Sequence, residues 1–182
     1  MRILLVGINF YPDLTGIGVY SADMAAYLGR QGHQVHVVSA PPYYPYWKVQ
    51  PGYKGWRYEH EGWEGMQVYR APLWVPGKPT GIKRLLHLFS FAVSSFPLLL
   101  GHIFWRPDLV ICVAPAFFSA PFAWLIAKLC GARSWLHIQD FELGKPSGQM
   151  AGSAWSTWKA SAVVWRPGLG VSGPRTRMAG FA

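Results

Sequence analysis

Short apolar runs alternate with helical patterns over the first 138 residues, and this alternation restricts the fold more than any other feature. Runs rich in Val, Ile and Leu between turn residues predict buried parallel strands at 2–8, 34–39, 108–113 and 134–138, with another at 66–70. Helical patterns lie at 18–31, at 82–104 with a break at Pro97, and at 117–129. This repetition predicts an α/β class, with a Rossmann-like parallel sheet and helices on both faces.

Four glycines stand beside the ends of predicted helices. Gly32 and Gly131 each follow a helix and precede a strand, so each is expected to end its helix in the left-handed conformation. Gly16 and Gly18 lie before the first helix, where exposed backbone and the helix dipole favour a phosphate group; a role in the turn alone is the alternative. The dinucleotide fingerprint is not met, because Ser21 takes the third glycine position, and this argues against NAD or FAD.

Residues 40–65 form a long segment rich in Pro, Gly, Tyr and Trp, without helical or strand periodicity. A loop of this length in a compact domain is usually functional. Its aromatic side chains either stack on a substrate or anchor the loop to the sheet, and both interpretations stay open. The candidates are Tyr43, Tyr44, Tyr46, Trp47, Trp56 and Trp63.

Polar side chains also follow the strand predicted at 134–138. His137 and Asp140 stand where open α/β sheets bind ligands, and either could orient a hydroxyl or accept its proton. The alternatives are a core histidine and a helix cap. Asp13, in the glycine loop, could bind a sugar hydroxyl. Cys112 and Cys130 indicate buried thiols in a reducing compartment, and no spacing in the sequence suggests a metal site.

The segment 85–105, LLHLFSFAVSSFPLLLGHIFW, is long enough to span a bilayer, but its His, Ser and Pro residues dilute its hydrophobicity. We expect a helix that packs on the sheet and touches lipid with its other face, with Lys83, Arg84 and Arg106 among the headgroups. A net charge of +9 with scattered Lys and Arg favours an anionic membrane surface over nucleic acid. The first eight residues lack a signal-peptide cleavage site, which indicates the cytoplasm.

The sequence changes character after residue 142. All eight Asp and Glu lie in residues 1–142, whereas 143–182 hold five of the 17 Lys and Arg and are rich in Gly, Ser and Ala. We therefore expect one domain at 1–142. The tail at 143–182 is expected to be irregular and basic, without a strand and with at most one helix at 150–165, as from a frameshift or a truncation.

The sequence of residues 1–47, MRILLVGINFYPDLTGIGVYSADMAAYLGRQGHQVHVVSAPPYYPYW, resembles the start of glycosyltransferase family 4 enzymes of GT-B fold. The similarity is greatest to those of colanic-acid and exopolysaccharide biosynthesis. It continues through KRLLHL at 83–88, RPD at 106–108, KLCGAR at 128–133 and LHIQD at 136–140. The resemblance covers about residues 1–142, the N-terminal half of a GT-B fold.

This resemblance implies an acceptor-binding domain, with a lipid-linked saccharide as acceptor at the inner face of the cytoplasmic membrane. A C-terminal donor domain would hold the nucleotide-sugar, and retaining transfer would need no metal or other cofactor. The loop Gly16-Ile17-Gly18 then faces the donor phosphates, and His137 and Asp140 match the catalytic cleft. The acceptor is expected at Asn9, Tyr11, Asp13, Tyr43, Tyr44, Tyr46 and Trp47.

One feature of the family is missing. The donor domain carries two glutamates spaced E-x7-E, and no two of Glu59, Glu61, Glu64 and Glu142 are eight apart. The chain alone is therefore expected to be inactive without its donor domain. The alternative is a non-catalytic domain that binds the membrane surface, a pseudoenzyme fragment.

Overall fold

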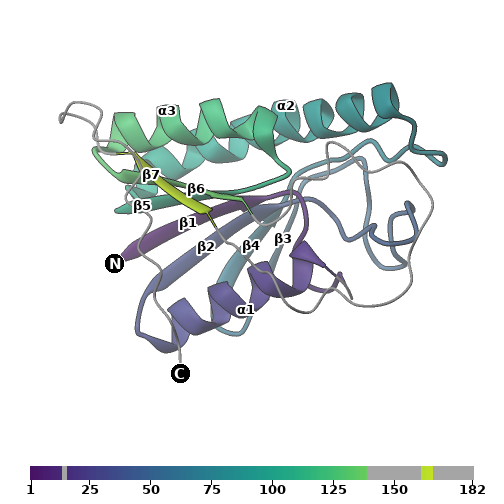
Figure 1. Ribbon diagram of the computed structural model, residues 1–182. Helices are drawn as coiled ribbons and strands as arrows, with labels where there is room; N and C mark the ends of the chain where they lie inside the picture. Colours follow the sequence, from purple (N-terminus) through teal and green to yellow (C-terminus); the bar gives the residue numbers. More distant parts are fainter. Residues whose placement is uncertain (14–15, 139–160, 166–182) are drawn as a thin grey trace.

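The computed structural model describes residues 1–13, 16–138 and the backbone of 161–165. Seven strands form one sheet in the order β3-β4-β2-β1-β5-β6-β7 (Figure 1). Neighbours from β4 to β6 pair in parallel, whereas β3–β4 and β6–β7 are antiparallel. The strands are β1 Arg2–Gly7, β2 Gln34–Ser39, β3 Glu59–Trp63, β4 Met66–Arg70, β5 Leu109–Val113, β6 Arg133–Ile138 and β7 Ser161–Trp165.

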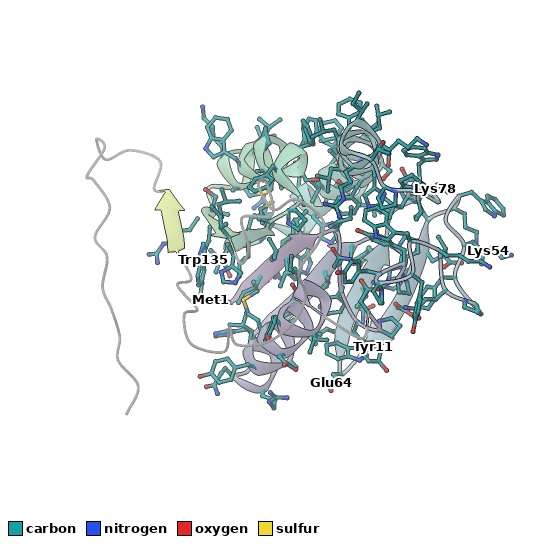
Figure 2. All side chains as sticks on the ribbon, turned by 45° about the vertical axis from the view of Figure 1, so that its right-hand side comes forward. Met1, Tyr11, Lys54, Glu64, Lys78 and Trp135 are labelled. Atoms are coloured by element: carbon teal, nitrogen blue, oxygen red, sulfur yellow. The ribbon has the colours of Figure 1, made fainter. Side chains whose placement is uncertain are left out.

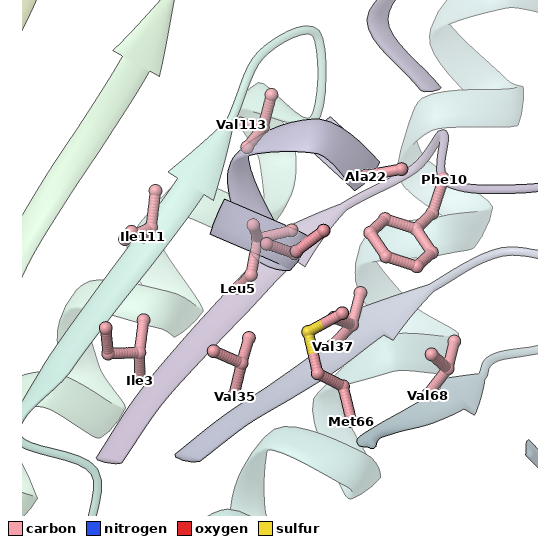
Figure 3. Packing of buried hydrophobic residues seen from close by; sticks show 12 residues of the cluster. Ile3, Leu5, Phe10, Ala22, Val35, Val37, Met66, Val68, Ile111 and Val113 are labelled. Carbon is pink, nitrogen blue, oxygen red and sulfur yellow. The ribbon is translucent and has the colours of Figure 1, made fainter. Parts of the chain in front are cut away.

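Helices cover both faces of the sheet, so the predicted α/β class is confirmed. They are α1 Ile17–Arg30, α2 Gly81–Trp105, the 3-10 turn η1 Phe117–Ser119 and α3 Ala120–Cys130. Successive strand residues face opposite sides, so Leu5 and Ile111 pack under α1 (Figure 3), whereas Leu4 and Val110 pack under α2 and α3. The small residues of α1, Ala22 and its neighbours, let this helix lie close to the strands.

Glycines stand at three of the helix ends. Gly32 has a φ of +80° and Gly131 has a φ of +68°, which confirms the predicted left-handed ends of α1 and α3. Gly16 has a φ of +65° and is the N-cap residue of α1. The glycine turn therefore leads directly from the loop after β1 into the first turn of this helix.

The break predicted at Pro97 is wrong, because α2 is one helix of 25 residues. Proline removes the hydrogen bond to the carbonyl four residues earlier. That residue is Val93, which is exposed, as is Pro97. Both positions lie on the solvent side of α2, where water can hydrate the freed carbonyl, so the helix continues.

The segment 40–65 is not entirely loop. Its last part forms β3, which pairs with β4 through a two-residue turn at Glu64 and Gly65, both with positive φ. The sequence EHEGW lacks the apolar alternation of a buried strand, since β3 lies at the edge of the sheet.

A strand also occurs in the predicted irregular tail. Ser161–Trp165 forms β7, antiparallel to β6, so the expectations of no strand there and of a helix through 165 are wrong for these residues. Residues 139–160 and 166–182 lie outside the described part of the chain, and Asp140 is among them.

Candidate functional site

The topology creates a switch point between β1 and β5. The chain adds β2 and β4 on one side of β1, and then returns to add β5 and β6 on the other side. The loops after β1 and β5 therefore diverge at the carboxyl end of the sheet, where open α/β sheets bind ligands. We call this region, formed by residues 8–13, 16–18, 40–47, 114–116 and 137–138, the carboxyl edge.

His137 reaches the carboxyl edge from β6. It lies in register with Val113 of β5, which in turn lies beside Gly7 of β1. The alternation of β6 places His137 on the same face as Trp135, which packs into the core under α1. Ile17, in the first turn of α1, packs against this same core. The structure thus brings the glycine turn and His137 to one face at one end of the sheet.

The surroundings of His137 favour a neutral imidazole. Burial lowers its pKa from the usual 6.5, since the charged form loses hydration. Its ring contacts Trp135 edge to face at 5.9 Å, and its backbone carbonyl accepts a hydrogen bond of 2.9 Å from the amide of Ala114. A neutral imidazole held in this way can accept a proton or a hydroxyl hydrogen bond near pH 7.

The two glycines of the turn are required for different reasons. At Gly16 a side chain would meet open space with only Tyr44 at 4.0 Å, so the positive φ explains the glycine there. At Gly18 an added Cβ would lie 2.6 Å from the Cβ of Asp13, so close packing explains it. The N-cap residue makes no side-chain bond to the helix, so the first N–H groups of α1 are not capped by it. These N–H groups could bind an anion, and the phosphate site expected here from the sequence therefore stays a prediction.

Asp13 joins two loops of the carboxyl edge. Its carboxylate is buried and accepts hydrogen bonds from Asn9 Nδ2 (3.0 Å) and from the amides of Tyr43 (3.2 Å) and Tyr44 (3.3 Å). Burial raises the pKa of Asp13, and these hydrogen bonds oppose that shift. Asn9 and Asp13 thus hold the loop after β1 against the loop after β2, and direct contact with an acceptor stays a prediction.

Arg70 is a functional candidate that sequence reasoning missed. It ends β4, is 1% exposed and donates to the carbonyls of Ala40 (3.0 Å) and Tyr11 and to the Glu61 carboxylate (2.8 Å). The available signal was its place as the third inward residue of the alternation Met66, Val68, Arg70. Through these two carbonyls, Arg70 holds the loop after β1 and the loop after β2 against the end of β4.

The predicted aromatic platform divides into buried and exposed members. Tyr43 is buried, Trp47 and Tyr44 are partly buried, and Trp63 belongs to β3. Tyr46 and Trp56 are about three-quarters exposed, at 73% and 75%. Tyr11 is also exposed and stacks on Trp63, with ring centroids 5.0 Å apart. Figure 2 shows Tyr11, Lys54 and Lys78 toward the end of the molecule away from Met1.

Within the residues that the structure describes, no group of three His, Cys, Asp or Glu side chains could hold a metal ion. The two cysteines there are unbonded to each other, and burial raises the pKa of Cys112 to about 12. The carboxyl edge therefore offers hydrogen-bonding, aromatic and helix-dipole groups as its means of binding and chemistry.

Comparison with known proteins matches residues 15–173 to the family described as "Glycosyl transferase 4-like domain". The chain is 54% identical over 144 residues, 79% of its length, to the putative colanic acid biosynthesis glycosyl transferase WcaI of Escherichia coli strain K12. This match covers 35% of that protein, so the chain spans about a third of its relative.

Two solved structures are similar at low identity. A sucrose-phosphate synthase from Thermosynechococcus elongatus is 15% identical, with a TM-score of 0.46 over 70% of this chain and 30% of that one. A ugt transferase from Siraitia grosvenorii, in complex with UDP, is 14% identical, with a TM-score of 0.45 over 75% and 27% of the two chains.

Proposed function

We propose that this chain, which belongs to the glycosyl transferase 4-like domain family, is the acceptor-binding lobe of a retaining GT-B glycosyltransferase. On this proposal the enzyme moves a sugar from a nucleotide-sugar to a lipid-linked saccharide during synthesis of an exopolysaccharide of the colanic-acid type. The E. coli relative, 54% identical over the matched part, supports this pathway. Transfer needs no metal ion or other cofactor, and a donor lobe outside residues 1–142 holds the nucleotide-sugar.

One observation carries the proposal: the glycine turn before α1 and His137 of β6 share one face of the carboxyl edge. The first N–H groups of α1 and the helix dipole suit a diphosphate that faces the lobe. The neutral imidazole of His137 suits a sugar hydroxyl beside it. Asp140, predicted from sequence to act with His137, lies outside the described residues.

The enzyme is proposed to work at the periphery of the cytoplasmic membrane, on its inner face. Seven exposed residues of α2 lie three or four positions apart and form one continuous apolar stripe along the helix: Ile82, Leu86, Phe89, Val93, Pro97, Leu100 and Phe104. By length and composition α2 is apolar enough to cross a membrane, and only 28% of its apolar window is buried in the protein, so most of this window is open to lipid. Its opposite face, with Phe91 and Leu99, packs on the core.

The charges and aromatic groups around the apolar stripe fit a helix that lies in the membrane surface. Lys83 and Arg84 stand at the start of α2 and Arg106 directly follows its end, where they can contact anionic headgroups. Tyr58 and Trp74 are about half exposed. The Tyr58 hydroxyl donates to the backbone carbonyl of Ser94, and the backbone amide of Trp74 donates to the Ser90 hydroxyl, both in α2. Such amphipathic rings prefer the headgroup level.

A transfer assay tests the proposed function. The chain is incubated with nucleotide-sugars and a lipid-linked acceptor, alone and with the C-terminal part of the E. coli relative supplied in trans. We expect a glycosylated lipid only when the donor lobe is present. The product should be lost with His137→Ala but not with His33→Ala, a control at a partly exposed residue in the turn after α1. No product in any mixture, together with intact vesicle binding, would favour the second candidate.

That second candidate is a non-catalytic domain of the membrane surface. The apolar stripe favours it, because this feature requires a membrane but no chemistry. The two candidates make the same prediction for vesicle binding and differ only in the transfer assay, so both measurements are needed.

A further inference from the structure

A buried histidine lies where the apolar stripe of α2 meets the carboxyl edge. His87 is 1% exposed, and its Nδ1 lies 2.7 Å from the carbonyl oxygen of Trp74. Since a carbonyl only accepts, Nδ1 must carry the proton. Nε2 is then a bare acceptor in the neutral ring, and among the described residues it has no hydrogen-bond partner. Buried polar atoms without a partner are rare and call for an explanation.

The ring of His87 is covered by aromatic side chains of the loop after β2. Trp47 lies 5.3 Å and Tyr43 lies 4.7 Å from it between ring centroids. Trp47 is only partly buried and has a φ of +50°, a left-handed conformation that a bulky residue rarely adopts. Residues with such strained backbone conformations occur often at ligand-binding sites. Trp47 thus covers the ring of His87 and is itself partly open to solvent.

Two cationic side chains stand near Trp47, at the start of α2. The guanidinium of Arg84 lies 5.5 Å from the centre of the Trp47 ring, and Lys83 is its neighbour in the first turn of α2. Neither residue has an ion pair within the described part of the chain. The first turn of α2 holds no acidic residue, and Thr80 makes no side-chain cap. The uncapped helix start and the two cations favour an anion beside Trp47.

We infer that Arg84, Trp47 and His87 form a binding site for a sugar phosphate, the headgroup of the acceptor. A phosphate binds at Lys83, Arg84 and the start of α2. The attached sugar stacks on Trp47 after this side chain moves aside, and one of its hydroxyls donates to Nε2 of His87. This assignment rests on the proposed function. It explains how an acceptor whose lipid lies along the apolar stripe presents its sugar at the carboxyl edge.

The test measures binding of glucose 1-phosphate and inorganic phosphate to the intact chain and three variants. We expect the sugar phosphate to bind more tightly than phosphate. His87→Phe should remove about tenfold of this affinity, the effect of one lost hydrogen bond, and leave phosphate binding unchanged. Arg84→Gln should weaken both probes. Lys128→Gln is the matched control, since it removes a cation that also lies over a tryptophan, Trp124, and should change neither.

A measurement on the unaltered protein keeps the test decisive if His87→Phe unfolds. Imidazole nitrogen NMR should show His87 as the Nδ1–H tautomer, and its Nε2 signal should shift when glucose 1-phosphate is added but not with inorganic phosphate. An unmoved Nε2 signal at saturating ligand, or equal affinity in His87→Phe, overturns the inference.

A second experiment distinguishes a lipid-linked sugar phosphate from a free one as the natural ligand. A farnesyl-diphosphate-linked glucose in vesicles should bind more tightly than free glucose 1-phosphate if the natural ligand is lipid-linked, and equal affinity would assign a free sugar phosphate instead. None of these measurements needs a donor lobe. Binding without transfer would therefore contradict only the proposed function, and transfer without a His87 effect would contradict only this site.

Discussion

At the residue scale, two buried charged side chains hold the carboxyl edge together. Asp13 joins the loop after β1 to the loop after β2 through hydrogen bonds from the amides of Tyr43 and Tyr44. Arg70 reaches the same two loops from β4. Neither residue faces solvent, so each acts on the site through the loops that it positions.

Replacing Gly18 by Ala should destabilise the protein by about 1–3 kcal/mol, because the new methyl group would lie 2.6 Å from the Cβ of Asp13, much closer than van der Waals contact, and must displace that side chain. Gly101→Ala is the control: it is also helical, has no atom within 4 Å of the added Cβ, and should stabilise by about 0.5–1 kcal/mol. Urea unfolding measures both. Equal effects of the two substitutions would contradict the close packing at Gly18.

Replacing Arg70 by Met should cost about 3 kcal/mol, because it leaves Glu61 and two carbonyl oxygens without their donor. Arg57→Gln breaks an exposed ion pair with Glu59 and should cost only about 0–1 kcal/mol. A loss below 1 kcal/mol for Arg70→Met in chemical unfolding would show that the loops are held by other contacts.

Some residues of the candidate site can be recognised from local sequence patterns, and others cannot. His137 could be placed because it stands near the end of an apolar run whose strand is recognisable locally, and Gly16 because it directly precedes a recognisable helix. Arg70 could not, since its partners Tyr11 and Ala40 lie far away in sequence and meet it only when β4 pairs beside β2. Likewise, no local pattern indicates that Tyr43 is buried against His87.

At the element scale, the strands divide into those that a continuous apolar run specifies and those that depend on pairing. β1, β2, β5 and β6 each pair with a strand on both sides, and their apolar runs predict them. β3 and β7 are edge strands whose sequences, EHEGW and SAVVW, were not predicted as strands. Whether these two segments form strands depends on the neighbouring strand that each pairs with, β4 for β3 and β6 for β7.

The apolar stripe of α2 should bind lipid. Phe89→Glu combined with Val93→Glu places two charges in its middle and should reduce binding to vesicles with anionic lipid by more than about tenfold. Tyr27→Glu, an exposed aromatic residue of α1 on the other face of the sheet, should have little effect. Vesicle flotation measures all three proteins, and unchanged flotation of the double variant would exclude the stripe as the membrane contact.

Packing of α2 on β2 should depend on pH through a histidine pair. His36 Nδ1 lies 3.3 Å from His102 Nε2, and the His36 ring stacks on Trp105 at 3.8 Å. Burial, with the charges of His102 and His60, lowers the pKa of His36 to about 4. Between pH 6.5 and 4 the unfolded chain therefore binds more protons than the folded one, so stability is complete above 6.5 and falls as the pH decreases.

Urea unfolding of the protein and of His36→Gln over this pH range measures the effect, and the loss should be smaller in the variant. The comparison is needed because burial lowers the pKa of His87, His102 and His137 in the same direction. The raised pKa of Asp13 acts oppositely, with stability lost as the pH rises through its folded value. Identical pH dependence of the two proteins would contradict a role for His36.

At the scale of the whole molecule, two surfaces meet at the start of α2. The apolar stripe lies on the α2 layer, and the carboxyl edge lies at the end of the sheet where α2 begins (Figure 1). If the proposed function holds, an acceptor whose lipid lies along the apolar stripe would reach the carboxyl edge beside the start of α2.

The most direct test of this account is hydrogen exchange of the intact chain with a polyprenyl-diphosphate saccharide in vesicles, compared with vesicles alone. We predict that the acceptor adds protection at the amides of 9–18, 43–47 and 114–116, and none at the opposite end of the sheet near His33 and Asp108. Added protection confined to that opposite end, or none beyond that of the empty vesicles, would contradict the central claim that the carboxyl edge binds the acceptor.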